Sequence, residues 1–230
     1  MTRTKANPHD HATRARQRRD ALVMAMLAHV PFDGWGKGAL ERAAADIGIP
    51  PGEAVVLFPD GARDAIAHFV DMADRMMIDD LAAHGLGGLK LREKVALAVR
   101  MRLERWTPHR EAIRRALAVM PMRVGPAASA ASLYRTVDAI WRAVGDQSVD
   151  FNFYTKRALL AAVYGSTLMF WLNDRSEDCA ATWAFLVRRI DDVMQVPKLR
   201  AKVTDRLGRL PNPLSLARRV RDRFGVRPVS

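Results

Sequence analysis

Helical periodicity constrains this chain more than any other feature of its sequence. Apolar residues recur every three or four positions almost throughout, and clusters of Gly and Pro interrupt that pattern. No stretch alternates apolar and polar residues for long enough to indicate a sheet. We therefore predict an all-α fold. The expected helices span residues 14–30, 37–47, 52–58, 63–84, 90–106, 109–119, 128–144, 150–172 and 177–195, with loops at 31–34 and 121–126.

The net charge of +12 lies in two segments of the chain. Residues 1–20 carry a net charge of +4 and residues 198–230 carry +8, whereas residues 21–197 hold equal numbers of acidic and basic groups. A basic protein first suggests a nucleic-acid partner. Because the body is neutral, we expect no nucleic-acid binding there, and we read residues 1–13 as a disordered basic tail.

Catalytic and metal-binding patterns are absent from the sequence. The Glu-x-x-His pairs of di-iron carboxylate proteins do not occur, and neither does a Gly-rich phosphate loop. A single cysteine, Cys179, excludes a disulfide framework and a multi-cysteine zinc site, and we interpret it as a small buried apolar residue. We expect no enzymatic activity, no metal site and no cofactor.

The last segment of the chain is basic and amphipathic. Beyond Pro211-Asn212-Pro213, apolar residues recur at spacings of three, three and four, with arginines between them. Such a helix suits the surface of an anionic membrane. Docking on its own body or on a neighbouring chain, and nucleic-acid binding, are the alternatives. The residues expected at the membrane are Leu214, Ala217, Val220, Phe224, Arg218, Arg219, Arg221 and Arg223.

Residues 14–62 resemble the helix-turn-helix of the tetracycline-repressor (TetR) family. Gly34, Leu40, Gly48 and the pair Leu57-Phe58 follow its spacing. The segment in the place of the recognition helix, residues 50–60, contains no Lys, Arg, Asn or Gln, and DNA readout needs such donors and cations. We predict a degenerate helix-turn-helix. The alternative is a TetR-type transcriptional regulator that binds DNA and has a hydrophobic ligand pocket.

The second half carries a more specific motif, GDQSVDFNFYTKR at residues 145–157. VDAIW precedes it, ALLAAVY follows it, and TWAFL at residues 182–186 and RIDDVM at 189–194 continue the likeness. Over about residues 17–196 the chain resembles the lipid-binding accessory protein family of ubiquinone (coenzyme Q) biosynthesis, the ninth Coq protein. One departure is Phe153, which stands where the family commonly has Trp.

This resemblance implies a TetR-like fold and a non-enzymatic role. It implies a homodimer that binds an isoprenoid lipid or quinone intermediate and presents it to the di-iron demethoxyubiquinone hydroxylase at the membrane. Residues 63–196 would form the lipid-binding and dimerisation domain, and residues 197–230 the membrane-associating segment. We expect a peripheral protein on the cytoplasmic face of a bacterial inner membrane.

The helix expected over residues 150–172 has two contrasting sides. Asp150, Phe153, Tyr154 and Arg157 share one side, at spacings typical of one helix face. The other side is expected to be the buried one, and it carries Phe151, Ala158, Ala162, Gly165 and Met169. The first side has the composition of a protein-binding hot spot, although its residues could equally be core residues and a cap. The resemblance favours a partner-binding patch of Asp138, Ile140, Trp141, Asp146, Asp150, Phe153, Tyr154 and Arg157.

Methionine and aromatic residues make a lipid pocket plausible in the second half. Methionine adapts to irregular apolar surfaces, including ligand tails, although the same residues could form an ordinary core. The candidate lipid-binding residues are Met76, Met101, Trp106, Leu117, Met120, Tyr164, Leu168, Met169 and Trp183.

Overall fold

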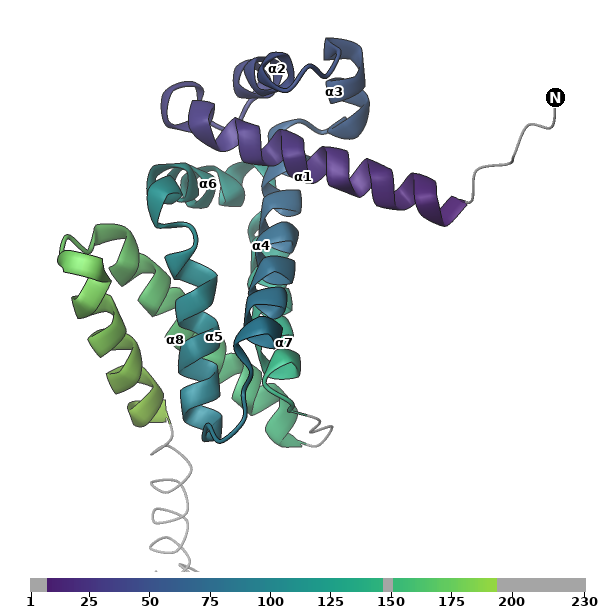
Figure 1. The fold of residues 1–230 in the computed structure, drawn as a ribbon. Helices are drawn as coiled ribbons and strands as arrows, with labels where there is room; N and C mark the ends of the chain where they lie inside the picture. The colour runs from purple at the N-terminus through teal and green to yellow at the C-terminus, as the bar shows by residue number, and fades with distance from the viewer. Residues whose placement is uncertain (1–7, 147–150, 194–230) are drawn as a thin grey trace, which may run out of the picture. The chain divides into compact units, whose positions relative to one another are not determined.

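The computed structural model describes residues 8–146 and 151–193 of the chain (Figure 1). The chain divides into two compact units, residues 1–187 and residues 188–230. Of the second unit the structure describes residues 188–193, which are helical. The predicted boundary at residue 197 and the predicted amphipathic helix beyond Pro211 lie outside the described residues.

The described residues are helical and contain no strand, which confirms the all-α prediction. The last described helix spans residues 180–193. The preceding elements are α1 (Pro8–Asp33), α2 (Lys37–Asp46), α3 (Pro51–Leu57), α4 (Ala62–His84), α5 (Leu91–Glu104), η1 (Thr107–His109), α6 (Arg110–Arg123), α7 (Pro126–Ala143), α8 (Phe151–Asn173) and η2 (Glu177–Cys179).

Prolines account for two differences from the predicted boundaries. Helix α1 begins at Pro8, so residues 8–13 are helical and not disordered as predicted. Proline suits the first turn of a helix because the amide that it lacks would have no partner there. Both α1 and α6 continue through an internal proline, Pro31 and Pro121, close to their C-terminal ends. The predicted loops therefore begin later, after Asp33 and Arg123.

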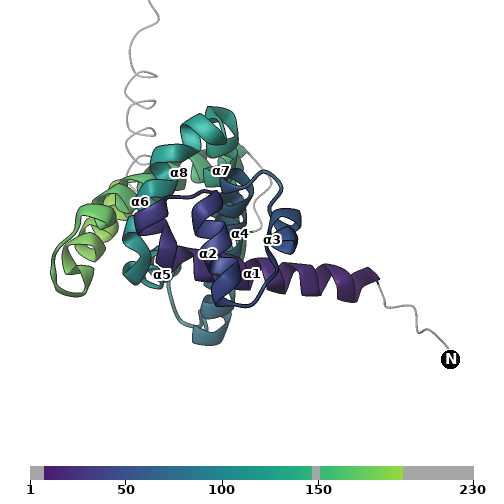
Figure 2. The ribbon, with the colours of Figure 1, turned by 90° about the horizontal axis from the view of Figure 1, so that it is seen from above.

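Helices α1, α2 and α3 gather at one end of the first unit, while α4, α5, α7 and α8 run below them (Figures 1 and 2). The loop after α1 is fixed to α6, because the indole Nε1 of Trp35 donates a hydrogen bond to the Ala112 carbonyl at 2.8 Å. The Trp35 ring also packs on Phe69 of α4, with centroids 5.7 Å apart. The helix-turn-helix-like segment thus belongs to the same compact unit as the helices below it.

A cluster of charged groups fastens α1 to α4. Asp20 on α1 lies 2.7 Å from Nε2 of His68, and Arg75 contacts the same carboxylate at 2.7 Å. Burial raises the pKa of Asp20, but hydrogen bonds from Arg75 and His68 outweigh it, and the net pKa is lowered. Burial also lowers the pKa of His68, against the opposing effect of Asp20. The contact therefore joins an ionised carboxylate to a histidine that resists protonation.

None of the described helices is both long enough and apolar enough to span a membrane.

Candidate functional site

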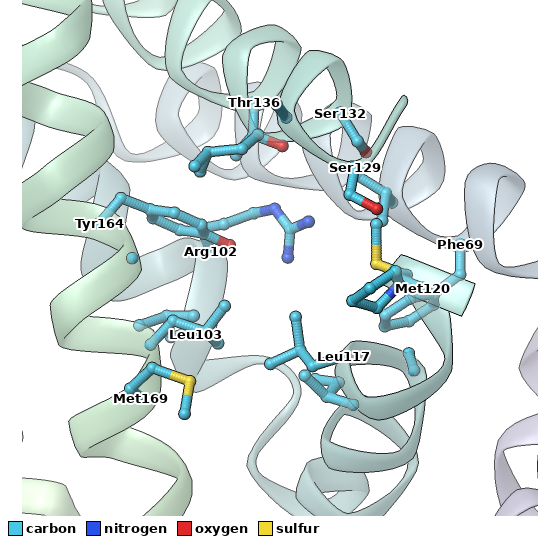
Figure 3. A pocket seen from close by; sticks show the side chains of 18 residues that line it. Phe69, Arg102, Leu103, Leu117, Met120, Ser129, Ser132, Thr136, Tyr164 and Met169 are labelled. Carbon is cyan, nitrogen blue, oxygen red and sulfur yellow. The ribbon is translucent and has the colours of Figure 1, made fainter. Parts of the chain in front are cut away.

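The first unit contains an open cavity of about 480 Å³, lined by residues of helices α4 to α8 (Figure 3). Its size falls within the range typical of small-molecule sites. Most of the side chains around it are apolar. The lining residues are Phe69, Val70, Arg102, Leu103, Ile113, Ala116, Leu117, Met120, Pro121, Ser129, Ala130, Ser132, Leu133, Thr136, Tyr164, Gly165, Leu168 and Met169.

Local sequence explains how the helices leave this space open. At Gly165 on α8, an added Cβ would meet no heavy atom within 4 Å, so the absent side chain widens the cavity. The turn between α6 and α7 borders the same space. There, Gly125 has a φ of +90°, and its amide donates to the Met120 carbonyl at 3.1 Å, which ends α6.

One end of the cavity is polar. Arg102 on α5 is 5% exposed, and its Nε donates to Oδ1 of Asp74 on α4 at 2.8 Å. Thr136 on α7 donates its hydroxyl to Oδ2 of the same carboxylate at 2.9 Å. Tyr164 on α8 lies beside the guanidinium, so four helices contribute to this polar end (Figure 3). We call Asp74, Arg102, Thr136 and Tyr164 the polar cluster.

Burial and mutual pairing together shift the pKa values of the polar cluster. Burial raises the pKa of Asp74, and the charge and hydrogen bond of Arg102 act against that shift. It also raises the pKa of the Tyr164 phenol, again opposed by Arg102. Burial disfavours the charged Arg102, but Tyr164 and Asp74 outweigh it and raise the pKa of the guanidinium. Tyr164 therefore keeps its proton at neutral pH and can donate a hydrogen bond.

The structure brings five of the nine predicted lipid-binding residues to the cavity. These are Leu117, Met120, Tyr164, Leu168 and Met169. Four lie elsewhere, because a periodic pattern marks an apolar face but not the place where packing leaves a void. The four are Met76, Met101, Trp106 and Trp183.

The two tryptophans among these four have specific contacts of their own. The ring of Trp106 lies behind the wall of the cavity, edge-on to Phe69 with centroids 4.9 Å apart. Trp183 donates its indole hydrogen to the Asp178 carbonyl at 2.8 Å, and the guanidinium of Arg100 lies over its ring.

Sequence reasoning missed the polar cluster apart from Tyr164. A signal for Arg102 exists, because it falls on the buried side of α5 together with Val95, Val99 and Leu103. A charged residue at an apolar position of a helix indicates a buried partner. Asp74 occupies a comparable position among the buried residues of α4.

The predicted partner-binding patch proves to be largely a buried ion-pair network between α7 and α8. Arg157 is 2% exposed, and its Nε and Nη2 each lie 2.7 Å from Oδ1 of Asp138. Asp146 lies 3.0 Å from the ammonium of Lys156. Ile140 and Trp141 are also buried. Tyr154 remains accessible at 70% exposure, Asp150 lies outside the described residues, and the side chain of Phe153 is not among those described.

The two sides of α8 are therefore not arranged as predicted. The buried stripe runs through Arg157, Leu160, Tyr164, Thr167 and Trp171. Three residues of the side that was expected to be buried are exposed, namely Ala158, Ala162 and Met169. The reason is that α8 is apolar almost all round, so periodicity does not distinguish its faces.

Helix α3, in the place of a recognition helix, presents apolar side chains to solvent. Val56 is 77% exposed and Val55 is 51% exposed. Its acidic residue, Glu53, forms an ion pair with Arg18 of α1. This surface offers neither the cations nor the amide donors of a typical DNA reader.

Comparison with known proteins identifies relatives of this chain. Residues 127–197, which include α8 and all of α7 except its first residue, match the model of the COQ9 family. The probable ubiquinone biosynthesis protein coq9, mitochondrial, of Dictyostelium discoideum is 32% identical over 79% of this chain and 61% of its own length. The ubiquinone biosynthesis protein COQ9, mitochondrial, of Homo sapiens is 33% identical over 76% of this chain and 57% of its own length. This chain is a homologue of the COQ9 proteins.

This COQ9 homologue can also be compared with its relatives in length and in fold. It spans about three fifths of the length of the curated relatives that it matches. A TetR transcriptional regulator from Nitrosomonas europaea shares its fold, with a TM-score of 0.64 and 21% identity over 77% of this chain and 98% of the regulator. The predicted TetR-like fold is confirmed.

The predicted location is wrong. We expected a protein of the bacterial cytoplasmic face, but the relatives from Dictyostelium discoideum, Homo sapiens and Drosophila melanogaster are all named mitochondrial. The prediction had no physical signal for a compartment, because helical periodicity and charge distribution are compatible with either one.

Proposed function

We propose that this chain acts in ubiquinone biosynthesis as a non-enzymatic protein that binds an isoprenoid lipid or quinone intermediate. The observation that carries the proposal is the largely apolar cavity of about 480 Å³ that helices α4 to α8 line. An apolar cavity with a few polar groups at one end suits a ligand with a polar head and an apolar tail. The names of the relatives, which are ubiquinone biosynthesis proteins, support the pathway.

Lipid that copurifies with the protein tests this function. Mass spectrometry of the purified 230-residue chain should recover an isoprenoid lipid or quinone. Gly165→Leu should reduce that recovery, because the new side chain would enter the cavity. Ala83→Leu, which makes a comparable change at an exposed position of α4, is the control. Recovery of no lipid, together with no binding of added isoprenoids, would contradict the proposal.

A protein partner completes the proposed role. The ligand would pass to the di-iron demethoxyubiquinone hydroxylase, and the exposed Tyr154 beside the ion-pair network is the proposed contact. Tyr154→Ala should weaken association with the hydroxylase in a pull-down or by surface plasmon resonance and leave the helical content unchanged. Tyr134→Ala, which removes a 42% exposed tyrosine from α7, is the control. Equal affinity of both variants and wild type would remove Tyr154 from the interface.

Membrane contact and dimerisation are further parts of the proposal. The apolar and basic residues of 214–224 would hold the protein on an anionic membrane. The exposed stripe of Ala158, Ala162 and Met169 on α8 favours a second copy of this chain as its cover. The double variant Val220→Asp, Phe224→Asp should reduce flotation with phosphatidylglycerol vesicles, and undiminished flotation would contradict the membrane contact. Ala162→Arg should lower the molecular mass measured by sedimentation, and an unchanged mass would contradict this dimer interface.

A transcriptional regulator is the competing function, and the shared fold is its support. The apolar surface of α3 opposes it. Sequence-selective, salt-dependent binding of duplex DNA would favour the regulator over the lipid protein.

A further inference from the structure

The guanidinium of Arg102 has donors that face the cavity. Within the described part of the chain, the guanidinium donates one hydrogen bond, from Nε to the carboxylate of Asp74. Its two terminal nitrogens point into the cavity, toward Leu117 and Met120 (Figure 3). A ligand that displaces water from these donors must supply acceptors in its place, because an unsatisfied donor is costly. A ligand that supplied acceptor oxygens at this place would satisfy them.

The charge at this place is already balanced. Asp74 neutralises Arg102 at 2.8 Å, and Arg102 is the one basic residue among the lining residues. An ionised carboxylate or phosphate on the ligand would therefore add an uncompensated negative charge to a buried site, which is strongly unfavourable. The geometry favours a ligand head that accepts hydrogen bonds and carries no charge.

Four hydroxyls line the cavity, those of Ser129, Ser132, Thr136 and Tyr164, and those of Ser129 and Thr136 are engaged with protein acceptors. Thr136 donates to Asp74, and Ser129 donates to the Gly125 carbonyl at 2.8 Å. The phenol of Tyr164 lies next to the Arg102 guanidinium (Figure 3). Tyr164 and the terminal nitrogens of Arg102 thus form a group of neighbouring donors, opposite the apolar wall of Leu117 and Met169.

We propose that Arg102 and Tyr164 determine the specificity of the cavity by binding an uncharged ligand head with neighbouring carbonyl or ether oxygens. The ligand lies with its head inward at the polar cluster and its apolar tail toward Leu117 and Met169. This inference rests on the proposed function, since it requires that the cavity take a lipid.

Equilibrium dialysis of the 230-residue chain against three probes tests the inference. Decylubiquinone has an uncharged head with neighbouring oxygens, decylbenzene has a similar tail without oxygens, and dodecanoate has a charged head. The wild type should bind decylubiquinone at least about tenfold more tightly than either of the others, a difference of about 1.4 kcal/mol.

Conservative variants assign that preference to residues. Arg102→Lys keeps a cation beside Asp74 but removes the forked donors, and it should bring the ratio of decylubiquinone to decylbenzene affinity close to one. Tyr164→Phe removes one hydroxyl and should lower the ratio about threefold to tenfold. Ser129→Ala, which removes a hydroxyl engaged with backbone, should keep the wild-type ratio. If circular dichroism shows that Arg102→Lys does not fold, the affinity ratio of Tyr164→Phe decides whether the polar cluster sets the preference.

The outcomes separate this inference from the proposed function. Binding of none of the probes contradicts the proposed function itself. Equal binding of decylubiquinone and decylbenzene by the wild type overturns the specificity but leaves a lipid cavity. Tighter binding of dodecanoate overturns the uncharged head, and a ratio that survives both Arg102→Lys and Tyr164→Phe overturns the assignment to these residues.

Discussion

Two arginines on one carboxylate allow the effect of burial on ion-pair strength to be measured within this protein. Asp138 lies 2.7 Å from Arg157, which is 2% exposed, and 2.8 Å from Arg142, whose side chain is 75% exposed. Removing one partner of a buried ion pair costs about 3–5 kcal/mol. Asp138 keeps Arg142 and Asp146 keeps Lys156 when Arg157 is replaced, so we expect the lower end of that range. Arg157→Met should thus reduce the free energy of unfolding by about 3 kcal/mol.

The matched variant is Arg142→Met, because it removes the same chemical group from the same carboxylate at an exposed position. We expect a loss below about 1 kcal/mol for it. Urea denaturation followed by circular dichroism at 222 nm measures both losses of free energy. In a thermal melt, the Arg157 variant should unfold roughly 6–12 °C below wild type. Adding Asp138→Asn to Arg157→Met should recover part of the loss, since a buried charge disappears. Equal losses from the two arginine variants would refute the reasoning.

Three further predictions concern the cavity and the turn after α8. Gly165→Ala should stabilise the protein by about 0.5–1 kcal/mol in thermal melts, because the position is helical and its Cβ meets open space. Gly125→Ala should destabilise it by about 1–2 kcal/mol, because φ is +90° there, and a stabilising result would contradict that reading. Partial burial of Asp174 raises the pKa of its carboxyl group, but hydrogen bonds from Thr182 and Ser176 outweigh this effect and hold that pKa well below its usual range. The stability that this carboxylate contributes is present above pH 4 and is lost as pH falls toward the lowered pKa, so Asp174→Asn should flatten the acid limb of a pH titration of unfolding.

Helices could be predicted from the sequence because their signals are local. Periodic apolar residues and flanking Gly or Pro located each helix, and Gly85 ends α4 at the expected place with a φ of +76°. The errors fell at prolines, where Pro31 and Pro121 lie inside helices near their ends. A proline there removes a hydrogen bond but does not force the chain to turn at once.

The candidate site could be predicted only in part, because a cavity depends on how several helices meet. Leu117 and Trp106 give the same signal in sequence, yet one lines the cavity and the other lies behind its wall. The buried face of α8 was not predicted correctly, because apolar residues surround that helix. The position of Arg102 within an apolar stripe was the strongest unused signal, since it required a buried partner on another helix.

The volume of the cavity limits how much of a lipid it can hold. At roughly 30 Å³ for each water-sized group, 480 Å³ accommodates about sixteen such groups. That capacity is enough for a substituted ring and the first few carbons of its tail. A long isoprenoid chain would therefore be gripped by one end, with most of its length outside the protein. Such a protein need not lift the whole lipid out of a bilayer, because the remainder of the tail can stay among the acyl chains while the head is held.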